Sequence, residues 1–315
     1  MNDLLNLLAK DPEKSKSKIQ RATAAIYSLA YNHKEQLDQL NRELAALDGA
    51  KLIQTFDCKG TQAILVEFPL FYALAFRGTE DDLQDIKSDV NAVMKPCVSG
   101  GQVHSGFNAA FECVEAQIKQ ALAQTEQGKS LLKDKPLLKG KPLLKDKPLL
   151  ITGHSLGGAL AVIAAKRLTF RYGIAGCYTF GSPRVGDEIW ISAIKTPIYR
   201  VVNAADSVTM LPPNALVING LSVIVGWIPY IGTFIRNFMV NKLHGYMHGG
   251  NMRYLTDCQS VDYHEVRLLY SVSFWFRVKA MWYGKTPFTR FIADHSIKIY
   301  RKKLAIIALK RNHKM

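Results

Sequence analysis

The segment Gly153-His154-Ser155-Leu156-Gly157 holds a serine between two glycines, a spacing typical of a nucleophile on a sharp turn between a strand and a helix. Residues 148–152 form a short run suited to a buried strand, and the alanine-rich residues 158–168 favour a helix. Side chains in place of the glycines would collide with the crossing strand and helix. The alternative is an ordinary turn in which Ser155 only caps the helix. The flanking pattern favours a nucleophilic serine.

A nucleophilic serine needs a base to take its proton and an acid to orient that base. In folds with this turn the chain order is nucleophile, acid, histidine. Asp206 directly follows a predicted strand at 198–202, and Asp187 is the competing acid. The pattern alone leaves the base open among the five histidines downstream of Asp206, which are His244, His248, His264, His295 and His313.

Strands and helices alternate along most of the chain. Short apolar runs predict strands, and 3.6-residue periodicity predicts helices. The expected strands are 52–56, 62–68, 72–76, 148–152, 174–180 and 198–202, and the expected helices are 16–47, a part of 79–95, 106–122 and 158–168. This order predicts an α/β fold with a mostly parallel central sheet covered by helices. We divide the chain into an N-terminal helical segment, 1–48, and a catalytic domain, 49–315.

Two further segments stand out. Residues 215–235 carry no charge and are long enough to cross a bilayer. Pro229, however, would break a helix there. A single crossing would also place Ser155 and the histidines that follow it on opposite sides of the bilayer. We therefore predict an apolar insertion at 215–240 that dips into an interface or covers the mouth of the site. Residues 131–148 repeat a hexapeptide three times, each copy ending in proline, which predicts a surface loop.

The formal charge of +15 is concentrated near the C-terminus, where residues 266–315 hold twelve Lys and Arg against the single acid Asp294. Aromatic residues are interleaved with these charges, as in segments that lie at a membrane interface. No nucleic-acid-binding motif accompanies them. The composition favours peripheral association with an anionic membrane surface, with no nucleic acid as partner.

The five cysteines are odd in number, widely spaced and without a C-x-x-C pair, which argues against a disulfide framework and a zinc site. The first residues, Met1-Asn2-Asp3-Leu4-Leu5, lack the basic and apolar regions of a signal peptide. We therefore expect a cytoplasmic location, and signal-independent secretion remains open.

Residues from about 50 to 305 resemble the class 3 lipase family, the fungal-lipase-like α/β-hydrolases. The resemblance rests on five segments: Phe76-Arg77-Gly78-Thr79, Val103-His104-Ser105-Gly106-Phe107, Thr152 to Leu160, Thr179 to Gly186, and Val201 to Pro213. It implies an α/β-hydrolase fold with no metal and no cofactor in the site. One departure is the acidic segment 80–85, which is a poor apolar lid; the insertion at 215–240 is the alternative lid.

The resemblance also implies roles for individual residues. Ser155 is the nucleophile, Asp206 the acid and His295 the base, in preference to His248. Thr79 and the backbone N–H of Leu156 would form the oxyanion hole.

The implied function is hydrolysis of lipid acyl esters through an acyl-enzyme, as a triacylglycerol or monoacylglycerol lipase or a phospholipase A1. Thioesterase or transacylase chemistry at the same triad is one alternative. A catalytically silent lipid-binding protein is the other.

Overall fold

The computed structural model describes residues 50–78, 93–98, 100–130, 147–213, 218–220, 222–223, 233, 236–237, 245–258, 263–282 and 294–312. Several predicted features lie outside these ranges: the helix at 16–47, the acidic segment 80–85, most of the hexapeptide repeat and most of the insertion at 215–240. The division of the chain near residue 48 therefore stays a prediction.

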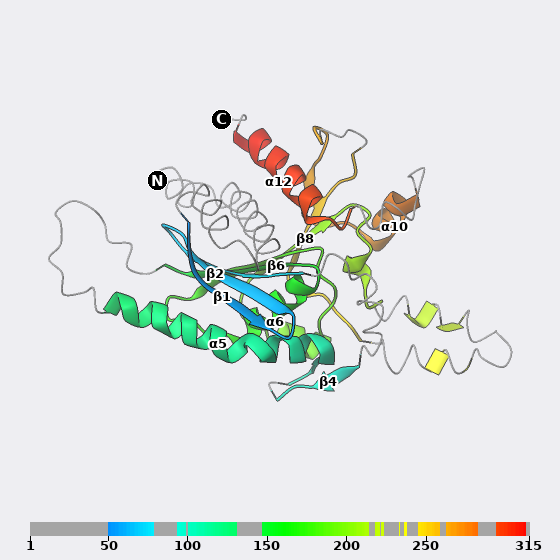
Figure 1. Cartoon of the computed structure of the whole chain (residues 1–315). Coiled ribbons are helices and arrows are strands. Elements are labelled where there is room, and N and C mark those ends of the chain that lie inside the picture. Colours follow the sequence, from blue (N-terminus) through cyan, green and yellow to red (C-terminus); the bar gives the residue numbers. More distant parts are fainter. Residues whose placement is uncertain are drawn as a thin grey trace.

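A central sheet of eight strands organises the chain (Figure 1). In spatial order the strands are β1 (Lys51–Cys58), β2 (Thr61–Glu67), β3 (Tyr72–Phe76), β6 (Leu149–His154), β7 (Ile174–Phe180), β8 (Ile198–Asn203), β9 (Asn251–Leu255) and β10 (Leu268–Leu269). The neighbours from β3 to β9 pair in parallel, and the pairs at the two edges are antiparallel. A separate ribbon pairs β4 (Met94–Pro96) with β5 (Gln102–His104). The predicted mostly parallel sheet is confirmed.

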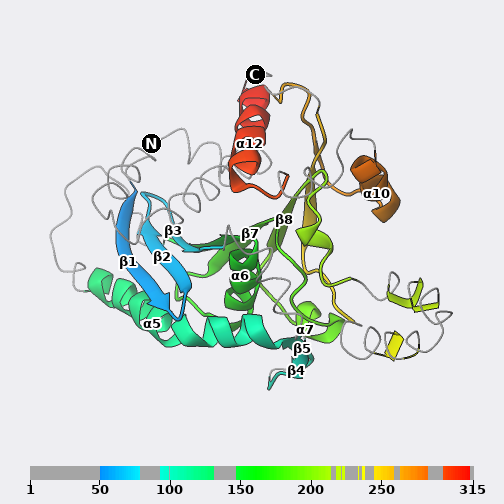
Figure 2. The ribbon, with the colours of Figure 1, turned by 45° about the vertical axis from the view of Figure 1, so that its right-hand side comes forward.

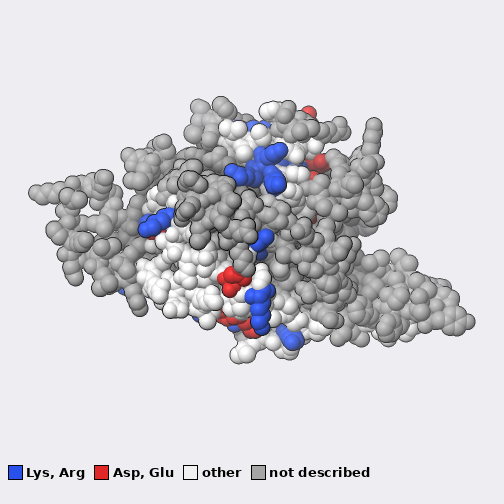
Figure 3. Space-filling view, in the orientation of Figure 1, with Lys and Arg blue, Asp and Glu red and all other residues white. Residues whose placement is uncertain are grey.

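Helices cover both faces of the sheet (Figure 2). Helices α5 (Ser105–Ser130) and α6 (Leu156–Arg167) pack on one face, and α12 (Ile297–Asn312) packs on the other. Strand β3 shows why: Leu74 faces the α5–α6 side, while Ala73 and Ala75 face α12. This alternation buries both faces, as expected for a parallel sheet. Exposed basic side chains of α12 lie in the region where lysine and arginine gather in Figure 3.

Two shorter α-helices and the 3₁₀ helix η1 (Val208–Met210) complete the described elements. Helix α7 (Glu188–Ser192) follows β7, and α10 (Phe274–Trp282) lies at the side of the molecule opposite β1 (Figures 1 and 2). Within the described residues, no helix is both long and apolar enough to cross a bilayer.

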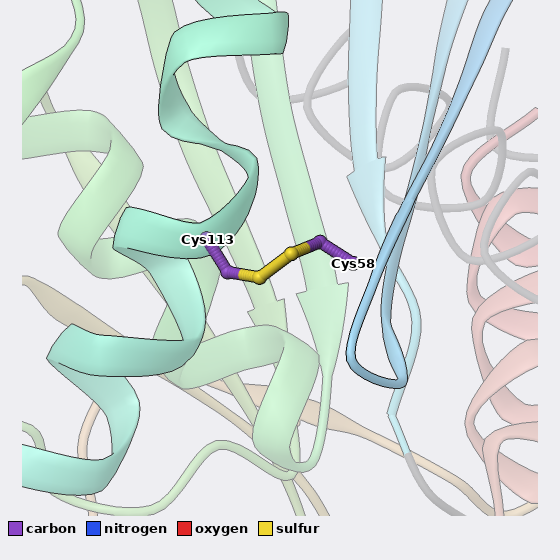
Figure 4. The surroundings of a disulfide bond; sticks show 2 residues. All are labelled: Cys58 and Cys113. Carbon is purple, nitrogen blue, oxygen red and sulfur yellow. A yellow bond between two sulfur atoms is a disulfide. The ribbon is translucent and has the colours of Figure 1, made fainter.

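A disulfide joins Cys58, at the end of β1, to Cys113 on α5 (Figure 4). The Cα atoms are 5.8 Å apart, although the residues are 55 positions apart in the sequence. The prediction against a disulfide was therefore wrong. The packing of α5 against β1 brings the two cysteines together, and their spacing in the sequence carries no sign of it.

Candidate active site

Ser155 lies at the turn between β6 and α6, with φ 53° and ψ −128°. This conformation is strained for a residue with a side chain and persists only where the surrounding structure imposes it. The flanking glycines make the turn possible: a side chain at Gly153 would collide with the carbonyl of Gly157, and one at Gly157 with the carbonyl of Phe76. Ser155 makes no side-chain capping hydrogen bond to α6, so the capping interpretation has no support.

The buried Asp206 pairs with the partly buried His295, although 89 residues separate them. The Nδ1–H group of His295 lies 3.0 Å from each carboxylate oxygen of Asp206. Asp206 follows β8, and His295 directly precedes α12, so the packing of α12 on the sheet brings them together. Within the described part of the chain, Nε2 of His295 and Oγ of Ser155 are buried without a hydrogen-bond partner. These are the two atoms between which a serine–histidine proton transfer would occur.

Gly181, at the end of β7, lies directly against this pair. It has φ 60°, and a Cβ atom there would lie 2.7 Å from Oδ2 of Asp206 and 2.9 Å from Nδ1 of His295. Such contacts are too short for real Cβ atoms. Because Gly181 has no side chain, the Asp206 carboxylate and the His295 imidazole can occupy this space and contact each other.

Two further donors hold the Asp206 carboxylate. The Tyr300 hydroxyl donates to Oδ2 at 2.5 Å, and the Val208 N–H donates to Oδ1 at 3.0 Å. The Tyr300 hydroxyl in turn accepts the Asn203 N–H at 2.9 Å. Burial, and then Asp206, raise the pKa of Tyr300 well above its ordinary value, so this hydroxyl stays a donor. Sequence reasoning missed Tyr300, because a tyrosine five positions after a histidine carries no signal of its own.

Contacts from two elements fix the backbone around His295. Nε2–H of His154 donates to the His295 carbonyl at 2.6 Å, and the Asn203 side-chain amide donates to the Asp294 carbonyl at 2.8 Å. The Asp294 carboxylate accepts the Ala205 N–H at 3.1 Å. Burial, followed by the effect of His295, lowers the pKa of His154 well below its ordinary value, so its ring is neutral. The histidine next to Ser155 thus supports the candidate base.

The predicted oxyanion hole is described only in part. Leu156 is the first residue of α6, where a backbone N–H has no acceptor inside the helix and can point to an anion. Thr79 lies outside the described residues, so its role stays a prediction.

The competing residues have other surroundings. Asp187 caps α7, where its carboxylate accepts the N–H groups of Trp190 at 2.8 Å and Gln102 at 2.9 Å. Nε2–H of His248 donates to the Thr209 carbonyl at 2.7 Å, and burial, Arg200 and Arg184 lower its pKa well below the ordinary value. His264 is exposed. The other two downstream histidines, His244 and His313, lie outside the described residues. Over the ranges that the structure describes, no cluster of three or more His, Cys, Asp or Glu could hold a metal ion.

The sequence is similar to a known protein family and to several curated proteins. The model of the family "Lipase (class 3)" matches residues 73–216. A secreted mono- and diacylglycerol lipase of Fusarium solani is 34% identical over 131 residues, which are 40% of this chain and 35% of that protein. The secreted mono- and diacylglycerol lipase LIP4 of Malassezia restricta is 26% identical over 178 residues, 50% of this chain and 54% of that protein. The chain thus spans between a third and about half of these curated relatives.

The fold recurs in solved lipase structures. The crystal structure of the lipase from Rhizopus microsporus var. chinensis superposes with a TM-score of 0.58 at 22% identity, covering 89% of this chain and 86% of that one. The predicted α/β-hydrolase fold is confirmed.

The prediction of a cytoplasmic location is contradicted. The two relatives described above, from Fusarium solani and Malassezia restricta, are named secreted lipases. The disulfide between β1 and α5 agrees with this correction, because such bonds persist in oxidising compartments and are rare in the cytosol.

The strained serine turn, the acid that follows β8 and the strands between them all lie within the segment matched by the family model. Residues 73–216 of this chain therefore match the class 3 lipase family, within an α/β-hydrolase fold in which α12 covers the second face of the sheet.

Proposed function

We propose that this chain hydrolyses lipid acyl esters through an acyl-enzyme at Ser155. The observation that carries the proposal is the Asp206–His295 pair, which lies beside the strained serine turn because His154 contacts the His295 carbonyl. Among the described residues, Nε2 of His295 and Oγ of Ser155 have no hydrogen-bond partner. A structural ion pair would need neither the strained turn nor the two buried, unpaired atoms.

The proposed reaction follows from these atoms. Ser155 Oγ attacks the acyl carbonyl carbon while His295 Nε2 takes its proton, and the Asp206 carboxylate stabilises the resulting imidazolium. The N–H of Leu156 and Thr79 would bind the oxyanion, and the loss of one such donor typically costs ~10²–10³ in turnover. The tetrahedral intermediate then expels the alcohol, which takes the proton from His295. Water repeats the sequence with the same base and releases the carboxylic acid and free Ser155.

Glycerol esters are the substrates that we propose, because both curated relatives are named mono- and diacylglycerol lipases. We place the reaction at a lipid surface outside the cytoplasm. Helix α10 supports a lipid surface, since Trp275 is 74% exposed and Phe276 is 47% exposed. Burial of side chains of this size contributes ~1.5–3 kcal/mol each.

Basic residues of α12 would add electrostatic attraction. Arg301 and Lys302 are exposed on this helix. A basic residue near an anionic leaflet contributes ~1 kcal/mol. Lys303 does not belong to this surface, because it is 1% exposed and donates to Oδ1 of Asn203 at 2.6 Å and to the Thr256 carbonyl at 3.1 Å.

The test is fatty-acid release from emulsified monoacylglycerol, diacylglycerol, triacylglycerol and phospholipid, by the wild type and by Ser155→Ala. We expect release from the mono- and diacylglycerol by the wild type only. Ser192→Ala is the matched control, because Ser192 lies on α7 and its hydroxyl donates to the Ile189 carbonyl. Release that persists at the wild-type rate in Ser155→Ala would refute the assignment of the nucleophile.

A further inference from the structure

Helix α10 lies beyond the segment matched by the family model, yet one of its side chains reaches the candidate acid. Arg277 is only 5% exposed, whereas its helix neighbours Trp275 and Phe276 are exposed. Its Nη2 group donates to the backbone carbonyl of Asp206 at 3.3 Å and forms a second, short hydrogen bond with Oγ1 of Thr209. The Thr209 hydroxyl itself donates to the same Asp206 carbonyl at 2.9 Å. A guanidinium from a distant helix thus holds the backbone of Asp206.

The positive charge of Arg277 lies close to the buried carboxylate of Asp206. Asp206 is buried, and burying an ionised carboxylate without a compensating charge is unfavourable. Burial lowers the pKa of Arg277, and the attraction of Asp206 is the largest effect that opposes this, so the two charges interact.

Two more buried arginines surround the same loop. Arg184 donates to the carbonyls of Met210 and Pro212, and Arg200 lies on β8. Burial, and after it repulsion from Arg277, lowers the pKa of Arg184 to about 10 and that of Arg200 to about 9. Among these arginines, Arg277 alone has Asp206 as an opposing charge in the described part of the chain.

We propose that Arg277 is a positioning residue for the catalytic acid: it fixes the backbone of Asp206 and stabilises the carboxylate that faces His295. The inference rests on the proposed function, in which Asp206 stays ionised while His295 becomes an imidazolium. Arg277 is also an exception to the prediction that the basic charges of residues 266–315 face a membrane, because it is buried.

The test uses a soluble short-chain ester, so that binding to a lipid surface does not enter. Arg277→Gln removes the charge but keeps a polar side chain of similar length, and we expect kcat to fall about tenfold or more with KM changed less than twofold. A tenfold loss equals about 1.4 kcal/mol of transition-state stabilisation. Arg277→Lys restores the charge and should recover a part of the loss. Lys279→Gln, an exposed position on the same helix, is the matched control and should behave as wild type.

The rate of labelling by a fluorophosphonate tests the proposed function and the positioning role of Arg277 separately. If the wild type is not labelled, the proposed function fails. If the wild type is labelled and Arg277→Gln is labelled equally fast, with an equal kcat, the positioning role fails and the proposed function stands. A loss in Arg277→Gln without any recovery in Arg277→Lys would also overturn the role of the charge.

A second variant keeps the inference testable if Arg277→Gln does not fold. Thr209→Val removes the hydroxyl that lies between Arg277 and the Asp206 carbonyl. We expect a lower kcat in this variant too. Where both single variants fold, their effects on kcat should not add in the double variant, because the two side chains hold the same carbonyl. Additive losses, or an unchanged kcat in Thr209→Val, would contradict the inference.

Discussion

Replacing Tyr300 by phenylalanine removes one oxygen atom from the support of the acid. That hydroxyl donates to Oδ2 of Asp206 at 2.5 Å and accepts the N–H of Asn203 at 2.9 Å. Tyr300, Asn203 and Asp206 are all buried, so water cannot replace either bond. Asp206 keeps the Val208 N–H and His295 as donors.

The expected magnitudes follow from these two bonds. A hydrogen bond to a charged group contributes about 1.5–3 kcal/mol, and a buried N–H left without an acceptor costs about 1–3 kcal/mol. Tyr300→Phe should therefore lower the free energy of unfolding by roughly 2.5–6 kcal/mol. If the whole energy of the hydrogen bond from Tyr300 to Asp206 stabilises the transition state, its loss should lower kcat about 10- to 100-fold.

The assay combines urea unfolding with kcat and KM on a soluble ester below the unfolding transition. Tyr270→Phe is the matched control, because its ring is about half exposed and lies outside the site. A variant that is destabilised as expected but keeps the wild-type kcat would refute the role of Tyr300 at the acid. The Asn203 contact and the packing of the ring in the core would then account for its burial.

The remaining predictions concern pH, the disulfide and the lipid surface. His154 and His248 have folded pKa values well below the ordinary 6.5, so below pH 6.5 these two histidines bind protons in the unfolded chain only. As the pH falls below 6.5, the free energy of unfolding should therefore decrease by up to about 2.7 kcal/mol per pH unit. His248→Gln should remove about half of that slope, as measured by urea unfolding at several pH values. Cys58→Ser opens a loop of 55 residues and should lower stability by about 4 kcal/mol, measured by urea unfolding, whereas an effect below 1 kcal/mol would contradict this. Replacing Arg301 and Lys302 by glutamine should weaken binding to anionic vesicles about 30-fold at low salt, and unchanged binding in sedimentation would exclude α12 from the lipid surface.

The central strands of the sheet could be predicted from the sequence because they are short apolar runs bounded by turns. The strands predicted at 62–68, 72–76, 174–180 and 198–202 lie within one residue of those observed. Strands β9 and β10 escaped prediction, since β9 reads Asn-Met-Arg-Tyr-Leu and β10 has two residues. Their assignment depends on pairing with neighbours and not on local pattern.

The site was readable where local geometry dictates residue type. The glycines around Ser155 and the acid at the end of β8 follow from steric and topological rules. The base does not, because a histidine is selected by where α12 packs, and five candidates follow Asp206 in the sequence. The resemblance to a family, and not the pattern, pointed to His295.

Residues that act through tertiary contacts gave no signal at all. Lys303 and Arg277 belong to a basic, aromatic region and look like surface charges in the sequence. In the structure both are buried and directed at the loops that hold Asp206 and His295. The cysteine pair was missed for the same reason, since a contact across 55 residues has no local pattern.

The most direct test of the central claim is the site and rate of covalent labelling by a fluorophosphonate. We expect a single labelled peptide that carries the reagent on Ser155, no labelling of Ser155→Ala, and rates that fall at least about 100-fold in both His295→Ala and Asp206→Asn. Label on another residue, or an undiminished rate in both partner variants, would contradict it.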